Sequence, residues 1–472
     1  MAAVVAAPRV MVLPFPAQGH VMPLMAVAHR LVEHGIEVEF VNTDFNHDRI
    51  IKAGGEAVPV GINMVSFPDG MGPDGDRADI GKLAAGLLAT MLGPIQEMVV
   101  SKKIRWVVAD VAMSWVVAAT AGCGVRVALF PLTSAAAFVL RLHVPKLIED
   151  GIIDEIGKMY MQFQLHIVRT RFEIKFDDRS ARRRAAGNVR RKERIQVIPR
   201  TPALDASELP WAGLGKNVIQ SIIRSIPALA VAEVIVCNTF EDIESEALAL
   251  FPKPALAVGP LVVSTCSSGH FWPQDRTCLS WLDAQAPRSV VYVAFGSLAV
   301  LEPTRFQELA DGLLLTGRPF LWVVRPNFAG GDGEVDELKR RVGGAGLVVG
   351  WAPQQGVLSH PSVACFVTHC GWNSTMEGAR HGVPLLCWPY FGDQFCNRSY
   401  VCDVWGTGMR LCADERGVVA KEEIRDKVAR LLGDEGIQAR VLSLKKAACA
   451  SAADGGSSHR DLLKFVNLLR EQ

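Results

Sequence analysis

The sequence has little net charge and lacks a basic face. In a chain of 472 residues, 50 Lys and Arg residues are balanced by 49 Asp and Glu residues, which leaves a formal net charge of +1. Twelve basic and four acidic residues lie within 156–194, so this stretch carries +8 and the rest of the chain −7. A mildly acidic body does not support a nucleic-acid-binding role, which needs a basic face built into the fold.

Disulfide, targeting and membrane signals are also missing. The 11 cysteines form no pair of C-x-x-C motifs and several lie in apolar runs, so we expect reduced, buried thiols. The apolar start of the chain has no basic segment and continues into the first expected strand, which predicts a cytoplasmic protein without a targeting segment. Residues 106–125, in which only Asp110 is charged, contain two glycines and predict a buried strand, helix and strand rather than a membrane span.

Common catalytic motifs are missing as well. The sequence has no G-x-S-x-G, H-E-x-x-H, Walker A or G-x-G-x-x-G motif, which argues against hydrolases, zinc proteases, nucleoside triphosphatases and redox Rossmann enzymes. Cys365, His369 and Cys370 are spaced so that neighbouring residues point to opposite faces of a strand, and no second pair of ligands accompanies them. We therefore expect no metal site.

Apolar residues, in contrast, make up 49% of the chain. Short β-rich runs alternate with helical patterns in two series, the first from 10 to a last run at 233–238 and the second over 289–387, which predicts βαβ units around parallel sheets. The expected fold class is α/β, with two Rossmann-like doubly wound domains that face each other across a cleft. We place an N-terminal domain at 1–250, a Pro-, Gly- and Ser-rich linker at 251–287, a C-terminal domain at 288–455 and a C-terminal helix at 456–472 that packs back on the N-terminal domain.

Two polar residues follow strands of the first series. His20 lies in a loop that leads from the first strand into a helix, and Asp110 ends the strand at 104–109. At the carboxyl edge of one sheet, the imidazole would serve as a general base and the carboxylate would fix its tautomer. The alternatives are a polar loop residue for His20 and an N-cap for Asp110.

A second candidate site lies within 368–377, where a strand runs through a glycine turn into a helix. Asn373 or Ser374 would lie at the helix N-terminus, whose free N–H groups and positive dipole end suit a phosphate, and His369 would add a donor. This arrangement predicts a diphosphate ligand. The alternative is a capping box, in which Glu377 reaches back to the helix start and binds nothing.

At this point the residues resemble a known family. Residues 351–394, a segment of 44 residues, closely resemble the signature segment of plant family 1 UDP-sugar-dependent glycosyltransferases, which have the two-domain GT-B fold. Residues 15–20 (FPAQGH), the strand that ends at Asp110 and residues 293–297 (VAFGS) also fit that family. The resemblance covers nearly the whole chain except about 156–190.

The resemblance implies a UDP-glucosyltransferase. It implies that Trp351 stacks on the uracil with Ala352 and Gln354 beside the base, that Glu377 binds the ribose hydroxyls, that Ser297, His369, Asn373 and Ser374 hold the diphosphate, and that Trp372, Asp393 and Gln394 hold the sugar. A final Gln in this segment usually accompanies UDP-glucose. The resemblance further implies that His20, oriented by Asp110, deprotonates an acceptor hydroxyl that displaces UDP with inversion, without a metal or other cofactor.

The expected acceptor is a small apolar molecule, such as a phenolic, flavonoid or hormone-like compound. The loops that would surround it are apolar and include Phe15, Ser134 and Phe138. We expect a monomer whose partners are this acceptor and the UDP-sugar, with no nucleic acid and no membrane span.

Residues 156–190 depart from the family pattern. This basic insertion is open to three interpretations: a solvated loop, a translated intron, or a segment that binds a membrane or partner. We expect low order there. Because it lies in the expected acceptor domain, the alternative function is a UDP-sugar-binding protein without transferase activity; a nucleotide-sugar epimerase is a more distant possibility, against which Gln394 argues.

Overall fold

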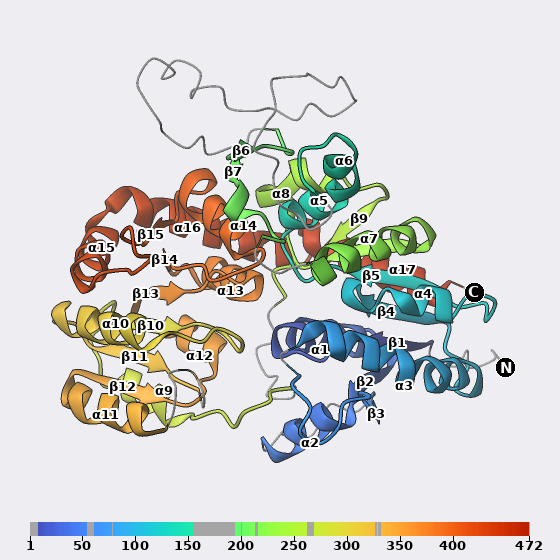
Figure 1. Cartoon of the computed structure of the whole chain (residues 1–472), viewed down its shortest axis with the longest axis horizontal. Helices are drawn as coiled ribbons and strands as arrows, with labels where there is room; N and C mark the ends of the chain where they lie inside the picture. Colours follow the sequence, from blue (N-terminus) through green and yellow to red (C-terminus); the bar gives the residue numbers. More distant parts are fainter. Residues whose placement is uncertain are drawn as a thin grey trace. The chain divides into compact units, whose positions relative to one another are not determined.

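The computed structural model describes residues 8–53, 61–77, 79–154, 194–199, 201–212, 216–261, 269–325, 328 and 332–471. They form two compact units (Figure 1). Unit 1 comprises Met1–Trp272 and Ser451–Gln472, and unit 2 comprises Pro273–Ala450. The basic insertion at 156–190 lies outside the described residues.

Unit 1 is built on a parallel sheet of seven strands in the order β3-β2-β1-β4-β5-β8-β9. Their bounds are β1 Arg9–Leu13, β2 Glu37–Thr43, β3 Ile62–Phe67, β4 Trp106–Asp110, β5 Arg126–Phe130, β8 Val234–Cys237 and β9 Ala255–Ala257. Strands β1, β4, β5 and β8 are largely apolar because helices cover both faces of a parallel sheet, whereas β2 includes Glu37 and Glu39. The strand order reverses between β1 and β4, which pair from Val10 with Trp106 to Leu13 with Ala109. This reversal is the topological switch point, where doubly wound folds bind ligands.

Nine α-helices accompany this sheet among the described residues: α1 Gln18–Glu33, α2 Asp44–Lys52, α3 Ile80–Ser101, α4 Trp115–Ala119, α5 Ala135–Leu142, α6 Val144–Glu149, α7 Lys216–Val231, α8 Glu241–Leu248 and α17 Ser457–Arg470. Helix α17 lies beside β9, far away in the sequence (Figure 1). Its Phe465, Val466 and Leu469 belong to the same buried cluster as Val10 and Trp106. Asp461 accepts a hydrogen bond from the Ala257 amide at 3.0 Å.

Unit 2 is built on a parallel sheet of six strands in the order β12-β11-β10-β13-β14-β15. Their bounds are β10 Val290–Ala294, β11 Phe320–Val323, β12 Gly346–Val349, β13 Val363–Thr368, β14 Leu385–Cys387 and β15 Gly408–Arg410. The helices are α9 Thr277–Asp283, α10 Pro303–Leu315, α11 Asp332–Val342, α12 Gln354–Ser359, α13 Trp372–His381, α14 Gln394–Ser399, α15 Lys421–Gly433 and α16 Glu435–Ala452.

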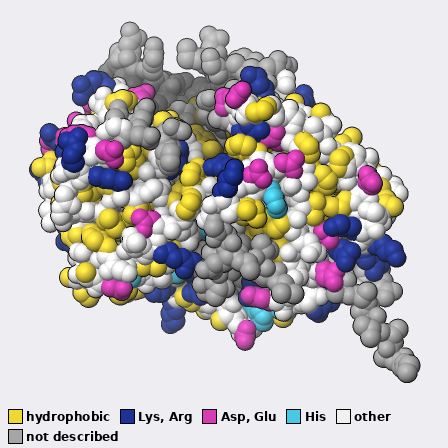
Figure 2. All heavy atoms as spheres, turned by 90° about the horizontal axis from the view of Figure 1, so that it is seen from below, with side chains coloured by type: hydrophobic (Ala, Val, Ile, Leu, Met, Phe, Trp, Pro, Cys, Tyr) yellow, Lys and Arg dark blue, Asp and Glu magenta, His cyan; other side chains and the backbone are white. Residues whose placement is uncertain are grey.

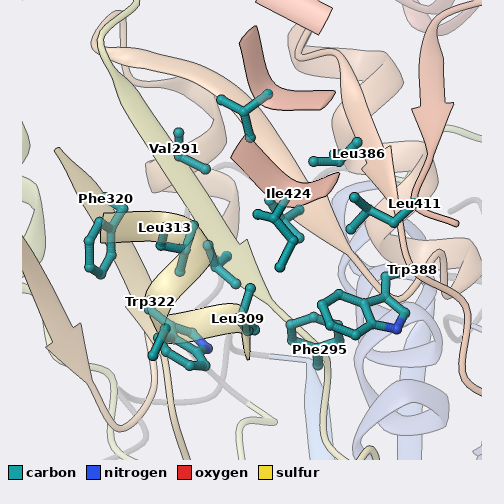
Figure 3. Packing of buried hydrophobic residues seen from close by; sticks show 14 of the residues in the cluster. Val291, Phe295, Leu309, Leu313, Phe320, Trp322, Leu386, Trp388, Leu411 and Ile424 are labelled. Carbon is teal, nitrogen blue, oxygen red and sulfur yellow. The ribbon is translucent and has the colours of Figure 1, made fainter. Parts of the chain in front are cut away.

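The core of unit 2 lies between this sheet and helices α10 and α15. Leu309 and Leu313 of α10 and Ile424 of α15 pack among Val291 and Trp322 of the strands (Figure 3). The two helices approach closely at Gly312, where a Cβ atom would lie only 2.8 Å from the Ile424 side chain. Glycine is therefore needed at this crossing.

The predicted α/β class with two doubly wound domains is confirmed for each unit. The division between them, however, falls after Trp272, and the stretch expected as a linker over 251–287 contains β9 and α9. The Pro- and Gly-rich composition of this stretch gives no sign of β9, a strand of only three residues. It pairs with β8, from Ile235 with Ala255 to Cys237 with Ala257.

One helix of the described residues is long and apolar enough to cross a membrane by length and composition alone. It is α3, whereas the stretch at 106–125 forms β4, the 3-10 turn Val111–Met113 and α4, and the second strand expected there, β5, begins at Arg126. Helix α3 buries one face, through Leu83, Leu87, Met91 and Ile95, and exposes Leu88 and Leu92 on the other. On the face of the molecule in Figure 2, Lys and Arg side chains are interspersed with Asp and Glu.

Candidate active site

His20 and Asp110 meet at the switch point of unit 1. The His20 Nδ1 atom lies 2.5 Å from the Asp110 carboxylate, within hydrogen-bond distance. The His20 side chain is 34% exposed and that of Asp110 only 3%, so the carboxylate is shielded while part of the ring reaches the surface of the unit. With Nδ1 engaged by a carboxylate, the opposite nitrogen Nε2 is left as the basic atom.

The local backbone explains this pairing. His20 lies in the first turn of α1 rather than in the preceding loop, because α1 begins at Gln18. Asp110 ends β4, and its carboxylate also accepts hydrogen bonds from the amides of Phe15 at 3.1 Å and Ala112 at 2.8 Å. Asp110 is thus both the cap of the 3-10 turn that follows β4 and a hydrogen-bond partner of His20, so the capping alternative holds while the catalytic role stays a prediction.

The residues predicted to surround an acceptor are largely buried within unit 1. Phe15 is 6% exposed, and its ring centroid lies 5.4 Å from that of His20. Ser134 is fully buried and caps α5, since its hydroxyl accepts the Ala137 amide hydrogen bond at 3.2 Å. Phe138 is 2% exposed and packs against Phe251. Phe15 therefore lies beside the His20 ring.

In unit 2, His369 follows β13 and is wedged between two glycines. A Cβ atom at Gly296 would lie 2.7 Å from His369 Nε2, and one at Gly371 would lie 2.5 Å from it. Ser297 follows Gly296 at the carboxyl end of β10, the strand that pairs with β13. The ring hydrogen-bonds to the backbone of Ala294, and burial lowers the pKa of His369 to about 4. Its Nδ1 atom is buried without a hydrogen-bond partner among the described residues.

Helix α13 begins directly after this turn. Its N-cap is Gly371, which supplies no side-chain acceptor to the first N–H groups of the helix. Asn373 and Ser374 lie in the first turn of α13 and Trp372 at its start, so His369, Ser297 and these N–H groups gather at the carboxyl ends of β10 and β13. An anion is favoured at such a helix terminus.

Glu377 does not form the capping box. Because α13 begins at Trp372, Ser374 is inside the helix, and the Glu377 carboxylate instead accepts hydrogen bonds from Gln354 Nε2 at 2.6 Å and Gln355 Nε2 at 3.2 Å. Gln354 Nε2 also donates to Ser374 Oγ at 2.9 Å. Burial raises the pKa of Glu377, and the two amides oppose that shift. This cluster joins α12 to α13.

Two members of this cluster escaped the sequence analysis. Tyr292, fully buried on β10, donates its hydroxyl hydrogen to Gln354 Oε1 at 3.2 Å and so turns the amide nitrogen toward Glu377. Gln355 was missed because the resemblance to the family implied a role for Gln354 alone, and nothing in the local sequence indicates the contact of Gln355 with Glu377. Trp351 and Ala352 precede α12. Ala352 belongs to a second buried cluster of unit 2, which includes Tyr292 and Phe366, and Trp351 packs against this cluster.

Asp393 and Gln394 lie at the start of α14. The Gln394 Oε1 atom accepts hydrogen bonds from the amides of Tyr390 at 2.7 Å and Phe391 at 3.0 Å, so its amide orientation is fixed. Asn397, which was not predicted, donates to Asp393 at 2.8 Å and to the Cys370 carbonyl oxygen at 2.9 Å. It thereby connects the start of α14 to the turn before α13.

Comparisons with known proteins agree with this architecture. The family described as UDP-glucoronosyl and UDP-glucosyl transferase matches residues 205–446. The chain is 37% identical to UDP-glycosyltransferase 83A1 of Arabidopsis thaliana, over 98% of this chain and 97% of the relative. It is 32% identical to 7-deoxyloganetin glucosyltransferase of Gardenia jasminoides, over 97% and 96% of the two chains.

Two solved structures share the fold over nearly the full length. One is a UDP-glucosyltransferase from Polygonum tinctorium capable of glucosylating indoxyl, in complex with 3,4-dichloroaniline, with a TM-score of 0.80, 26% identity and full coverage of both chains. The other is Os79 from O. sativa in complex with UDP, with a TM-score of 0.78 and 26% identity, covering 98% of this chain and 100% of that one. The chain therefore belongs to the UDP-glucoronosyl and UDP-glucosyl transferase family, and its two units are the Rossmann-like domains of a GT-B enzyme.

Proposed function

We propose that this protein transfers glucose from UDP-glucose to a hydroxyl group of a small apolar acceptor, with inversion at the anomeric carbon. The observation that carries the proposal is the hydrogen bond between His20 Nδ1 and Asp110 at 2.5 Å. It fixes the tautomer that leaves Nε2 without a proton, and an imidazole nitrogen in this state suits the removal of a hydroxyl proton.

The reaction is a single displacement. Nε2 of His20 takes the acceptor proton while the acceptor oxygen forms a bond to the anomeric carbon, and the bond from that carbon to the UDP oxygen breaks. Asp110 stabilises the imidazolium that forms. Because attack and departure occur on opposite sides of the carbon, one displacement inverts its configuration.

The leaving UDP would be stabilised in unit 2. The N–H groups at the start of α13, the Ser297 hydroxyl and His369 lie around the same turn and would share the charge of the diphosphate. These groups take the role that a divalent cation plays in other transferases, so we propose that no metal is required. Activity that survives EDTA and is not raised by Mg²⁺ or Mn²⁺ is the expected result.

Other residues of unit 2 would contact the uridine and the sugar of UDP-glucose. Trp351 offers an aromatic face to uracil, and Glu377 offers a carboxylate to the ribose hydroxyls. Gln394 keeps Oε1 on the 390–391 backbone, and its Nε2 would donate to a sugar hydroxyl. Trp372 and Asp393 would complete the sugar site.

Relatives support a small acceptor. Two of those described above are named as glucosyltransferases, and the enzyme from Polygonum tinctorium glucosylates indoxyl. Another relative, 30% identical over 98% of this chain and 98% of its own, is linamarin synthase 1 of Manihot esculenta. We propose an acceptor of the phenolic, flavonoid or hormone-like class.

The test is release of UDP from UDP-glucose in the presence of a panel of phenols and flavonoids. His20→Ala should lower kcat/KM by roughly 10²- to 10⁴-fold while the affinity for UDP stays unchanged, because the base contacts the acceptor. His34→Ala, at the other end of α1, is the matched control. UDP binding without transfer to any acceptor would favour the alternative of a UDP-sugar-binding protein, and full activity of His20→Ala would refute the assigned base.

A further inference from the structure

Unit 1 contains a buried carboxylate that the proposed reaction does not use. Glu244 of α8 is only 2% exposed. Its two oxygens accept hydrogen bonds from the amides of Ala135 at 3.0 Å and Ala136 at 2.9 Å, and from the Thr239 hydroxyl at 2.7 Å. The backbone of Glu244 is not helical, with φ −139° and ψ 22°, so helix α8 is kinked at the residue that carries this carboxylate.

The carboxylate connects the carboxyl ends of two neighbouring strands. Ala135 and Ala136 begin α5, which follows β5, and Thr239 follows β8, which pairs with β5. Because Ser134 caps the Ala137 amide, two side chains between them satisfy three amides of the first turn of α5. The orientation of α5 is therefore fixed from β8, more than 100 residues later in the chain.

Burying a carboxylate is costly, which points to a specific demand at this position. Burial raises the pKa of Glu244 to about 7, although the three donors favour its ionised form. A helix start that is exposed to water needs no such group, because water satisfies its N–H groups. Here the start of α5 is dry, since Ser134, Ala135 and Ala136 are each at most 1% exposed.

The segment that Glu244 fixes lies next to the His20–Asp110 pair. Phe130, the last residue of β5, is the register partner of Asp110 at the end of β4. The turn at 131–134 follows directly and carries two partly exposed residues, Leu132 and Thr133, at the same edge of the sheet. Strand β5 is the neighbour of β4 and adjacent strands lie about 5 Å apart, so this turn borders Asp110, while β1, which leads to His20, lies one strand further along the sheet.

We propose that Glu244 is a positioning residue for the acceptor: by fixing the start of α5 it holds Leu132 and Thr133 in place beside the His20–Asp110 pair, where they contact the bound acceptor. This inference rests on the proposed transfer to an acceptor hydroxyl. It separates the acceptor from the donor, because Glu244 belongs to unit 1 and the proposed UDP contacts belong to unit 2.

The experiment compares Glu244→Gln with Glu241→Gln, which makes the same chemical change at an exposed position of α8. The glutamine amide group would face an N–H donor at the start of α5 and displace it. We expect Glu244→Gln to raise the KM for a phenol or flavonoid acceptor about tenfold or more, while the KM for UDP-glucose and the Kd for UDP stay within twofold of wild type. Glu241→Gln should match the wild type.

A second variant keeps the test decisive if Glu244→Gln does not fold. Thr239→Val keeps the shape of the side chain but removes one of the three donors, and it should raise the acceptor KM about threefold. Unchanged KM values with only a lower kcat would mean that fewer molecules are active, and would overturn the inference. An inactive wild type would instead refute the proposed function, so the two failures are distinguishable.

Discussion

Asp110 combines two roles in one side chain. Its carboxylate caps the turn after β4 through the Ala112 amide and also receives the His20 ring and the Phe15 amide. A simple cap would need only the first of these contacts. The additional partners fix the His20 ring that borders Phe15.

Asp110→Asn should separate these roles. The asparagine oxygen still accepts one amide, but its NH₂ group forces the opposite tautomer on His20, so Nε2 is protonated and no longer basic. We expect kcat to fall roughly 10²- to 10⁴-fold at an unchanged Kd for UDP. Asp79→Asn, which alters the cap of α3, should leave kcat unchanged. If Asp110→Asn and Asp79→Asn changed kcat equally, Asp110 would act only as a helix cap.

His369 should take up a proton when UDP binds. Burial lowers its pKa to about 4, so the ring is neutral at pH 7 in the unliganded protein. An anionic diphosphate beside the ring favours the imidazolium and raises that pKa. Calorimetry in buffers of different ionisation enthalpy should therefore show more proton uptake for wild type than for His369→Asn. His360→Asn, at a position paired with Asp283, is the control and should behave as wild type.

The turn between β13 and α13 is built around the His369 ring. Gly371 has φ −58°, a value open to any residue, so alanine there is excluded only by its contact with the ring. Gly371→Ala should displace His369 at a cost of about 1–3 kcal/mol and weaken UDP binding roughly tenfold. Gly344→Ala, where a Cβ atom meets nothing within 4 Å, should not change the Kd. Isothermal titration with UDP distinguishes the two results.

The contact between α8 and α5 should make the stability of unit 1 depend on pH. The pKa of Glu244 rises from its ordinary 4.5 to about 7, so the folded chain retains a proton that the unfolded chain releases between these values. Stability from this group is complete below about pH 4.5 and is lost as the pH rises through 7.

Urea unfolding at pH 5 and pH 8 measures this effect. The advantage of wild type over Glu244→Gln, which has no carboxyl to titrate, should shrink by on the order of a few kcal/mol at the higher pH. The difference between wild type and Glu241→Gln should be the same at both pH values. A constant difference for Glu244→Gln would contradict the raised pKa.

The sequence predicted those features that depend on residues close together in the chain, namely the strands and the polar residues at their ends. Buried strands such as Trp106–Asp110 are continuous apolar runs, and the end of a strand predicts which polar residues share a sheet edge, as for His20 and Asp110. The capping-box alternative was wrong because the start of α13 at Trp372, two residues earlier than Ser374, moves Glu377 away from the helix end. A shift of two residues is enough to change such an assignment.

Long-range partners could not be predicted in this way. Glu244 meets Ala135, 109 positions away, and Tyr292 meets Gln354, 62 positions away. Each is an ordinary residue of its helix or strand by local pattern, and only the packing of neighbouring strands brings it to its partner. Strand β9, three residues long in a Pro-rich stretch, was missed for the same reason.

Helix α17 contributes to the core of unit 1 from the far end of the chain. Phe465 is fully buried in the cluster that includes the strands beside β1. Phe465→Ala should destabilise unit 1 by about 3–5 kcal/mol, because it removes a large buried side chain, while the Kd for UDP stays unchanged. Leu463→Ala, which alters a partly exposed residue of the same helix, should cost far less. Denaturant unfolding of both variants measures the difference.

The return of the chain to unit 1 has a consequence during synthesis on the ribosome. The packing on β9 and the cluster around Phe465 stay incomplete until all of 273–450 has been translated, because α17 follows that stretch. Unit 2, in contrast, is continuous in sequence and can fold as soon as it emerges. The nascent chain can therefore complete unit 2, the proposed nucleotide-binding half, first, while the apolar surface of unit 1 that α17 covers stays exposed until the end of synthesis.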